Sequence, residues 1–187
     1  DNGALVADAG SDGWRVLTVG RLSAAKGFDR AVAAASILKA RGVHFTWRVL
    51  GAGEQEKQIR EWVRAAQIEE CFLLLGAVPN PYPHIAACDL YVQPSNWEGK
   101  AVAVREAQMM RKPVIITRYA TADSQVRDGV DGLIAEMSAE SVADRIQEVM
   151  QDVVLRRRLS ENCEPRLYSN EQEVGKISVM ASGLAVR

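Results

Sequence analysis

The chain has 187 residues, which suits one compact domain, with or without a tail, better than two full domains. Its formal net charge of -1 and pI near 6.2 exclude the global basic field that binding to nucleic acid or an anionic membrane usually requires. No apolar run approaches the ~20 residues that cross a bilayer. Cys71, Cys88 and Cys163 lack metal-site or disulfide spacing, and we interpret them as reduced core thiols of a cytoplasmic protein.

The two ends of the chain differ in composition from the part between them. Residues 1–13 are rich in Gly, Ala and Asp and do not begin with methionine, so we interpret them as a linker or the edge of a longer polypeptide. Residues 14–168 are predicted to form one domain. Residues 169–187 carry only a weak helical pattern and are predicted to be a helical tail.

From residue 14 onward, short apolar runs alternate with longer amphipathic segments, which is typical of βαβ units. The predicted strands are 14–19, 45–50, 71–75, 90–93, 114–117 and 132–135. The predicted helices are 29–40, 54–66, 82–87, 101–110, 141–150 and 155–162. Right-handed crossovers then favour an α/β fold with a doubly wound, Rossmann-like parallel sheet of order 3-2-1-4-5-6. Such a sheet binds its ligand outside the strands' carboxyl ends, between the first and fourth strands.

The loop after the first predicted strand begins at Gly20 and carries two cations, Arg21 and Lys26. A diphosphate needs compensating positive charge, and the chain has no D-x-D pair to hold a divalent metal. Arginine supplies a bidentate fork and lysine a mobile point charge, so the pair suits a diphosphate. Two loop cations are also common as plain surface charges, and the pattern alone leaves both readings open.

Gly51 and Gly53 lie between the second predicted strand and the following helix. The third glycine of a dinucleotide-binding G-x-G-x-x-G would fall at Glu56, so that fingerprint fails. A tight turn remains, in which the backbone can approach a ligand closely or can serve a purely structural purpose. The next loop, after the third strand, carries Ala77 and Val78.

The loop after the fourth predicted strand carries Glu98 and Gly99, and Glu106 follows eight residues after Glu98. If a helix runs from Gly99, the two glutamates are ~12 Å apart along its axis. That exceeds the about 5–10 Å between paired carboxylates that act on one glycosidic bond. We expect them to hold different ends of an extended ligand, with a phosphate-binding helix N-terminus between them. Alternatively, Glu98 complements the helix dipole and Glu106 faces neighbours or solvent.

This arrangement resembles the E-x7-E motif of retaining, nucleotide-sugar-dependent glycosyltransferases of the GT-B fold, the group-one family. Segments similar to the family's landmarks follow one another in its order: 19–22, 26–27, 50–53, 87–95, 112–115 and 131–134. The resemblance implies the carboxy-terminal, donor-binding half of a two-domain enzyme that transfers a hexosyl group to a polysaccharide or glycolipid. It also implies a missing N-terminal acceptor domain and possible peripheral membrane association of the full enzyme.

The resemblance assigns roles to particular residues. Arg21 and Lys26 would meet the diphosphate and, with Glu98 on the donor sugar, form the catalytic group. Glu106 would hold the ribose hydroxyls, since a carboxylate accepts two hydrogen bonds. The remaining donor-binding residues would be Gly20, Gly51, Gly53, Ala77, Val78, Gly99, Lys100, Ala101 and Val102. We expect a UDP or GDP sugar as donor and no metal or other cofactor.

Two other functional classes stay open at this point. A sugar-nucleotide epimerase also uses two such domains and a diphosphate site. A non-catalytic nucleotide-binding module with a flavodoxin-like sheet is the other class. Such a module ordinarily has an acidic cluster after strands one and three, and this chain offers Arg21 and Lys26 instead. Lys100 stands where the family commonly has an aromatic residue, so the specificity for the donor sugar does not follow from the resemblance. We expect the 187-residue chain alone to bind the donor weakly and to transfer nothing.

Overall fold

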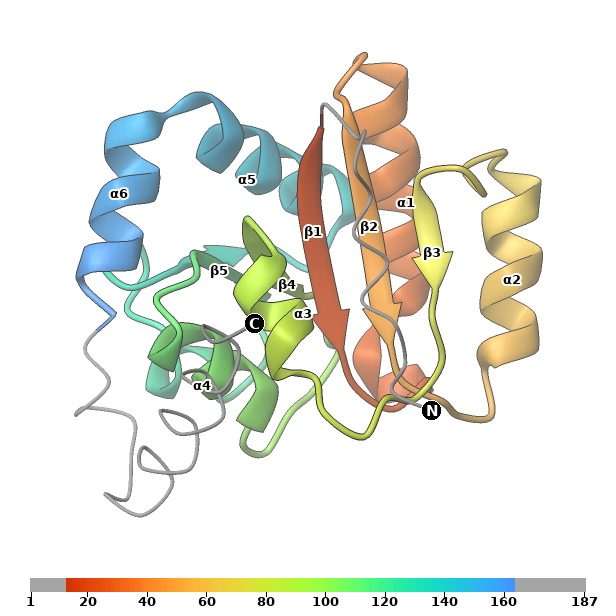
Figure 1. Ribbon diagram of the computed structural model, residues 1–187, viewed down its shortest axis with the longest axis horizontal. Helices are drawn as coiled ribbons and strands as arrows, with labels where there is room; N and C mark the ends of the chain where they lie inside the picture. The colour runs from red at the N-terminus through yellow and green to blue at the C-terminus, as the bar shows by residue number, and fades with distance from the viewer. Residues whose placement is uncertain (1–12, 164–187) are drawn as a thin grey trace, which may run out of the picture.

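The computed structural model describes residues 13–163, and the predicted alternation of strands and helices is confirmed there (Figure 1). The strands are β1 (Trp14–Val19), β2 (Phe45–Leu50), β3 (Phe72–Leu74), β4 (Leu90–Gln93), β5 (Val114–Thr117) and β6 (Leu133–Ala135). The helices are α1 (Phe28–Ala40), α2 (Glu56–Ala65), α3 (Tyr82–Ala87), α4 (Val102–Met109), α5 (Ala139–Gln151) and α6 (Val153–Glu161). Two short 3-10 turns are η1 (Ala24–Lys26) and η2 (Ala122–Ser124). The tail predicted at 169–187 lies outside the described residues.

The strands form one parallel sheet in the order β3-β2-β1-β4-β5-β6, as predicted. Because all pairings are parallel, the carboxyl ends of the strands lie at one edge, to which the arrowheads of β1, β2 and β3 point in Figure 1. The winding reverses between β1 and β4, where Val16 pairs with Leu90. The loops after β1 and β4 therefore leave the sheet side by side.

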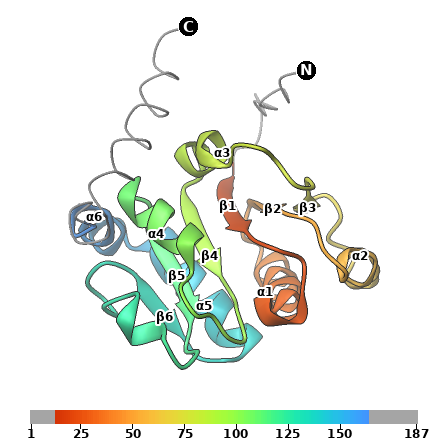
Figure 2. The same ribbon diagram turned by 90° about the horizontal axis from the view of Figure 1, so that it is seen from below.

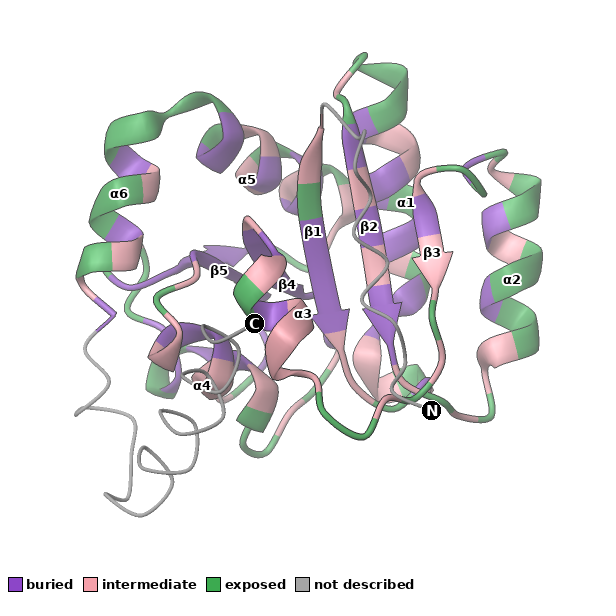
Figure 3. Ribbon diagram, viewed as in Figure 1, coloured by how far each residue is buried: buried purple, intermediate pink, exposed green. Residues whose placement is uncertain are grey.

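Helices cover both faces of the sheet (Figure 2). The larger core cluster joins one sheet face to α1, α2, α5 and α6, and the smaller one joins the other face to α3 and α4. Neighbouring residues of a strand point to opposite faces, so Val16 packs in the larger cluster and Leu17 in the smaller. The strands are mostly buried or half-buried, while the outer sides of α2 and α6 are exposed (Figure 3). Burial on both faces explains the near-continuous apolar runs of the sequence.

The helix after β4 begins at Val102, one residue after the predicted start at residue 101, and it does not reach back to Gly99. Three bonds to distant groups hold the backbone of residues 98–101. The carbonyls of Glu98 and Gly99 accept from side chains of residues 121 and 125, and the amide of Ala101 donates to the side chain of residue 125. These bonds fix the course of the loop just before the first turn of α4.

Two helices begin earlier than predicted because of capping side chains. The Ser138 hydroxyl accepts from the amide of Ser141, which starts α5 at Ala139. The Asp152 carboxylate accepts from the amide of Leu155, which starts α6 at Val153. Each cap satisfies a donor that the helix itself leaves unbonded, and Ser and Asp are preferred there for that reason.

Cys88 and Cys163 are buried free thiols, and Cys71 is half-buried and also free. Burial raises the pKa of both Cys88 and Cys163 to about 12, so these two thiols stay protonated at neutral pH. The interpretation of core thiols is therefore confirmed for them. Among the helices of residues 13–163, none is long and apolar enough to cross a membrane.

Candidate functional site

The loops after β1 and β4 are joined closely at the carboxyl edge of the sheet. Gly27 has a left-handed backbone (φ 62°), and a Cβ atom there would lie 2.0 Å from the carbonyl oxygen of Pro94. The Asn96 amide donates to the carbonyl of Ala25 at 2.8 Å. The Arg30 guanidinium donates to the Pro94 carbonyl and to the Asn96 side chain. Only glycine allows this contact at position 27, and the two loops act as one unit.

A cavity of about 310 Å³ lies beside this joined pair of loops. Its lining residues come from β1, β4, the two loops and the first turns of α4: Val19, Gly20, Lys26, Gln93, Lys100, Ala101, Val102, Ala103 and Glu106. Six of these residues were candidate site residues on sequence grounds. Val19, Gln93 and Ala103 were not. The cavity lies at the switch between β1 and β4, where the topology predicts a ligand.

Lys26 and Glu98 form an ion pair beside the cavity. The Lys26 Nζ lies 2.6 Å from the Glu98 Oε1, and their side chains are only 19% and 9% exposed. The same Oε1 accepts from the Ser95 hydroxyl at 2.6 Å and from the Gln93 amide at 3.2 Å. Within the described residues, the hydrogen bonds to this carboxylate all end on Oε1. The Oε2 atom is therefore left to accept hydrogen bonds from a ligand.

Gln93 connects this ion pair to the buried sheet. The Tyr91 phenol donates to the Gln93 Oε1 at 2.8 Å. Burial raises the pKa of Tyr91 well above its usual value, so the phenol stays a donor. With its Oε1 accepting from Tyr91, the Gln93 amide nitrogen faces Ser95 and Glu98. A glutamine at the end of an otherwise apolar central strand is the signal that would have found this residue.

Glu106 lies on α4 and takes part in the same cavity from its opposite side. The Tyr82 hydroxyl, at the start of α3, donates to the Glu106 Oε1 at 3.1 Å. Tyr82 was not predicted as a site residue. Its position just after the loop that follows β3, where Ala77 and Val78 lie, is the available signal. This hydrogen bond fixes the direction of a carboxylate that faces the cavity.

Several candidate residues lie outside the cavity lining. Arg21 is 75% exposed at its side chain and pairs with Glu54 at 3.2 Å, away from Lys26. An exposed pair of this kind is weak and breaks easily. The others outside the lining are Gly51, Gly53, Ala77, Val78, Glu98 and Gly99, of which Glu98 reaches the cavity through its contact with Lys26.

Gly51 and Gly53 approach the protein's own backbone. A Cβ atom on Gly51 would lie 1.9 Å from the carbonyl oxygen of Gly20, and one on Gly53 would lie 2.3 Å from that of Leu22. The Leu22 amide also donates to the carbonyl of Ala52 at 3.0 Å. These glycines therefore have a structural purpose, because they let the loops after β1 and β2 touch, and their role in donor binding stays a prediction.

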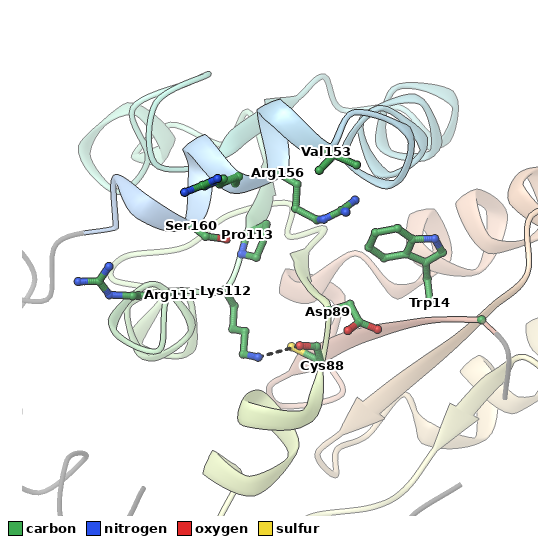
Figure 4. Close-up of a pocket in the computed structure, with 11 residues that line it drawn as sticks. Trp14, Cys88, Asp89, Arg111, Lys112, Pro113, Val153, Arg156 and Ser160 are labelled. Carbon is green, nitrogen blue, oxygen red and sulfur yellow. Dashed lines mark hydrogen bonds between the residues drawn. The ribbon is translucent and has the colours of Figure 1, made fainter. Parts of the chain in front are cut away.

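A larger cavity of about 710 Å³ lies at the opposite, amino-terminal edge of the sheet (Figure 4). Two of the four cations that line it, Lys112 and Arg156, bind backbone carbonyls at helix ends. Lys112 donates to the carbonyl of Cys88 at 2.9 Å, and Arg156 donates to the carbonyls of Val149 and Met150. Arg156 also lies 4.7 Å from the centre of the Trp14 ring. These bonds stabilise packing, and the smaller cavity at the carboxyl edge is the better candidate site despite its size.

Positive charge at the candidate site comes from lysine side chains. Lys26 and Lys100 line the cavity from two different loops, and Lys100 is exposed. Among residues 13–163, no cluster of three His, Cys, Asp or Glu side chains is placed to hold a metal ion. An anionic ligand would therefore meet ammonium groups and backbone amides here.

Comparison with known proteins gives a family match over most of the chain. The family model described as glycosyl transferases group 1 matches residues 7–166. A putative colanic acid biosynthesis glycosyltransferase, WcaL of Salmonella typhimurium, is 31% identical over 142 residues, covering 71% of this chain and 35% of that protein. The alpha-D-kanosaminyltransferase of Streptomyces kanamyceticus is 26% identical over 153 residues, covering 80% of this chain and 40% of that protein. The chain spans less than half the length of these two relatives.

Solved structures share the fold. The Anabaena protein HepE, in complex with UDP and glucose, superposes with a TM-score of 0.77 at 22% identity, covering 94% of this chain and 49% of that one. The C-terminal domain of the group 1 protein LpcC from Francisella tularensis gives a TM-score of 0.71 at 23% identity, covering 80% of this chain and 82% of that one. At these identities the likeness shows the fold alone. It places the described sheet among those of GT-B glycosyltransferases.

Proposed function

Because the chain belongs to the glycosyl transferases group 1 family, we propose that it binds a nucleoside diphosphate sugar, the donor of a glycosyl transfer. The observation that carries this proposal is the grouping of Lys26, Lys100 and Glu106 around one cavity at the sheet's switch point. Cations suit a diphosphate and a carboxylate suits paired hydroxyls. HepE, which shares the fold, was crystallised with UDP and glucose, in keeping with such a ligand.

The donor's diphosphate and sugar would lie near the ion pair. Lys26 would contact the phosphates while it keeps its ion pair with Glu98. Arg21 would leave its exposed pair with Glu54 and also contact the phosphates. Glu98 would then accept from a sugar hydroxyl at Oε2, the oxygen left by its other partners. Because Lys26, Ser95 and Gln93 all hold its Oε1 atom, this carboxylate is preorganised for that task.

The nucleoside would extend toward α3. Glu106, directed by Tyr82, would accept from the ribose hydroxyls. The loop with Ala77 and Val78 would meet the base through backbone groups. UDP and GDP are the donors we propose to test first.

In the reaction, the bond from C1 of the sugar to the diphosphate oxygen breaks and negative charge gathers on the departing diphosphate. Lys26, Arg21 and the amides before α4 would stabilise that charge without a metal ion. We propose transfer with retention of the anomeric configuration, and we assign no covalent nucleophile. The acceptor would be a polysaccharide or glycolipid, as the name of the colanic acid relative suggests, and would meet a separate N-terminal domain.

The test compares the 187-residue chain with the longer polypeptide that its relatives' lengths imply. With an α-configured UDP or GDP sugar and a lipid-linked or oligosaccharide acceptor, we expect an α-linked product from the longer protein, read by NMR of the anomeric proton. The 187-residue chain should bind the donor and yield no product. An inverted product would contradict retention, and transfer by the short chain would contradict the need for a second domain. Isomerised donor without acceptor would favour an epimerase.

A further inference from the structure

Two side chains from the segment after β5 form hydrogen bonds with the backbone of the loop that precedes α4. The Thr121 hydroxyl donates to the carbonyl of Glu98 at 2.8 Å. The Gln125 amide nitrogen lies 3.4 Å from the carbonyl of Gly99, and its Oε1 accepts from the amide of Ala101 at 3.2 Å. The three successive peptide groups between Glu98 and Ala101 are thereby bound to Thr121 and Gln125, the two residues that flank η2.

These contacts set the direction of the neighbouring amides. In a trans peptide the N–H points opposite to the C=O, and the structure contains no cis peptide bond among its described residues. Because the carbonyls of Glu98 and Gly99 point toward Thr121 and Gln125, the amides of Gly99 and Lys100 point the other way. A Cβ atom on Gly99 would meet nothing within 4 Å. Two consecutive amides that point away from Thr121 and Gln125 form the kind of backbone group that binds anions.

The side chains of Thr121 and Gln125 are themselves fixed. Gln125 is only 5% exposed, and its Oε1 also accepts from the Tyr119 phenol at 3.1 Å. Burial raises the pKa of Tyr119, so the phenol stays a donor. The Gln125 nitrogen donates to the Thr121 hydroxyl at 3.1 Å. Arg105, from α4, donates to the carbonyls of Ser124 and Gln125 and so locks the segment against the helix.

The structure assigns to Thr121 and Gln125 the role of positioning residues that aim the Gly99 and Lys100 amides at the donor's diphosphate. This inference rests on the proposed function, since it needs a diphosphate at the cavity. Neither side chain lines the cavity, and neither is required to touch the ligand. Their effect should therefore fall on phosphate recognition and leave the nucleoside contacts of Glu106 intact.

The test is a Thr121→Val variant, which keeps the side chain's shape and loses its hydroxyl, with Thr121→Ser as the matched control. UDP, GDP, uridine and guanosine are titrated by NMR into each 187-residue chain. We expect Thr121→Val to bind the diphosphate about five- to tenfold more weakly, the effect of one hydrogen bond, and the nucleoside unchanged. The serine variant should match the wild type. The shifts of the Gly99 and Lys100 amides on adding diphosphate should shrink in the valine variant only.

Unchanged diphosphate binding by Thr121→Val would overturn the inference. An equal loss for nucleoside and diphosphate, with a lower melting temperature, would do the same, because it would indicate a merely structural role. Thr121→Ala serves as a second variant if the valine chain fails to fold. If the wild type binds nucleosides and diphosphates not at all, the proposed function itself fails, which is a different result from a variant-specific one.

Discussion

A Lys26→Met variant is expected to bind UDP or GDP about 10- to 100-fold more weakly than the wild type, because a hydrogen bond to a charged group contributes about 1.5–3 kcal/mol. The variant should also lose about 1–3 kcal/mol of unfolding free energy, since the Glu98 carboxylate, 9% exposed, loses its cation. Ser95 and Gln93 still donate to that carboxylate and limit the loss. Calorimetric titration and urea unfolding measure the two effects.

Lys39→Met is the matched control, because Lys39 also pairs with a glutamate, Glu70, but on the exposed surface. Its side chain is 45% exposed, and solvent weakens pairs of this kind. Nucleotide affinity should not change. If Lys26→Met bound the diphosphate as tightly as Lys39→Met does, the assignment of Lys26 to the phosphates would be wrong.

Gly53→Ala is expected to destabilise the fold by about 1–3 kcal/mol, the typical cost of overpacking. The added Cβ would lie 2.3 Å from the carbonyl oxygen and 2.7 Å from the carbonyl carbon of Leu22, and backbone atoms cannot move aside as a flexible side chain can. Leu22 is fixed on both sides, since its amide donates to Ala52 and its carbonyl accepts from the amide of Gln55. A lowered urea midpoint with an unchanged slope is the expected observation.

Gly99→Ala provides the comparison for that variant. No atom lies within 4 Å of a Cβ built at Gly99, and its backbone is not in the left-handed region. Its unfolding free energy should stay within about 0.5 kcal/mol of the wild type, as for most surface substitutions. Equal stability of the two alanine variants would show that the contact between the loops after β1 and β2 is not tight.

The sheet could be predicted from the sequence because its signals are local and repeat along the chain. Strands β1, β2, β4 and β5 have the predicted bounds, since each is an apolar run between turn residues. The strand order follows from right-handed crossovers once six strands alternate with helices. The same reasoning placed Lys26 and Glu98 at one crevice, because their loops follow β1 and β4, and the two side chains form an ion pair there.

What the sequence could not reveal depends on contacts between distant residues. The loop before α4 is held by bonds to Thr121 and Gln125, more than twenty residues away. Arg21 is turned outward by Glu54, which lies after another strand. Tyr82 meets Glu106 only because α3 and α4 cover the same face of the sheet. No local pattern carries such information.

The central claim is that the cavity between the β1 and β4 loops binds a nucleoside diphosphate. The most direct measurement is an NMR titration of the 187-residue chain with UDP, GDP and ADP, repeated with Glu106→Ala. The account predicts saturable binding of one diphosphate, with amide shifts in residues 20–26 and 95–106 and a loss of binding in the variant. Absence of binding by all three, or shifts confined to the opposite cavity around Trp14 and Arg156, would contradict it.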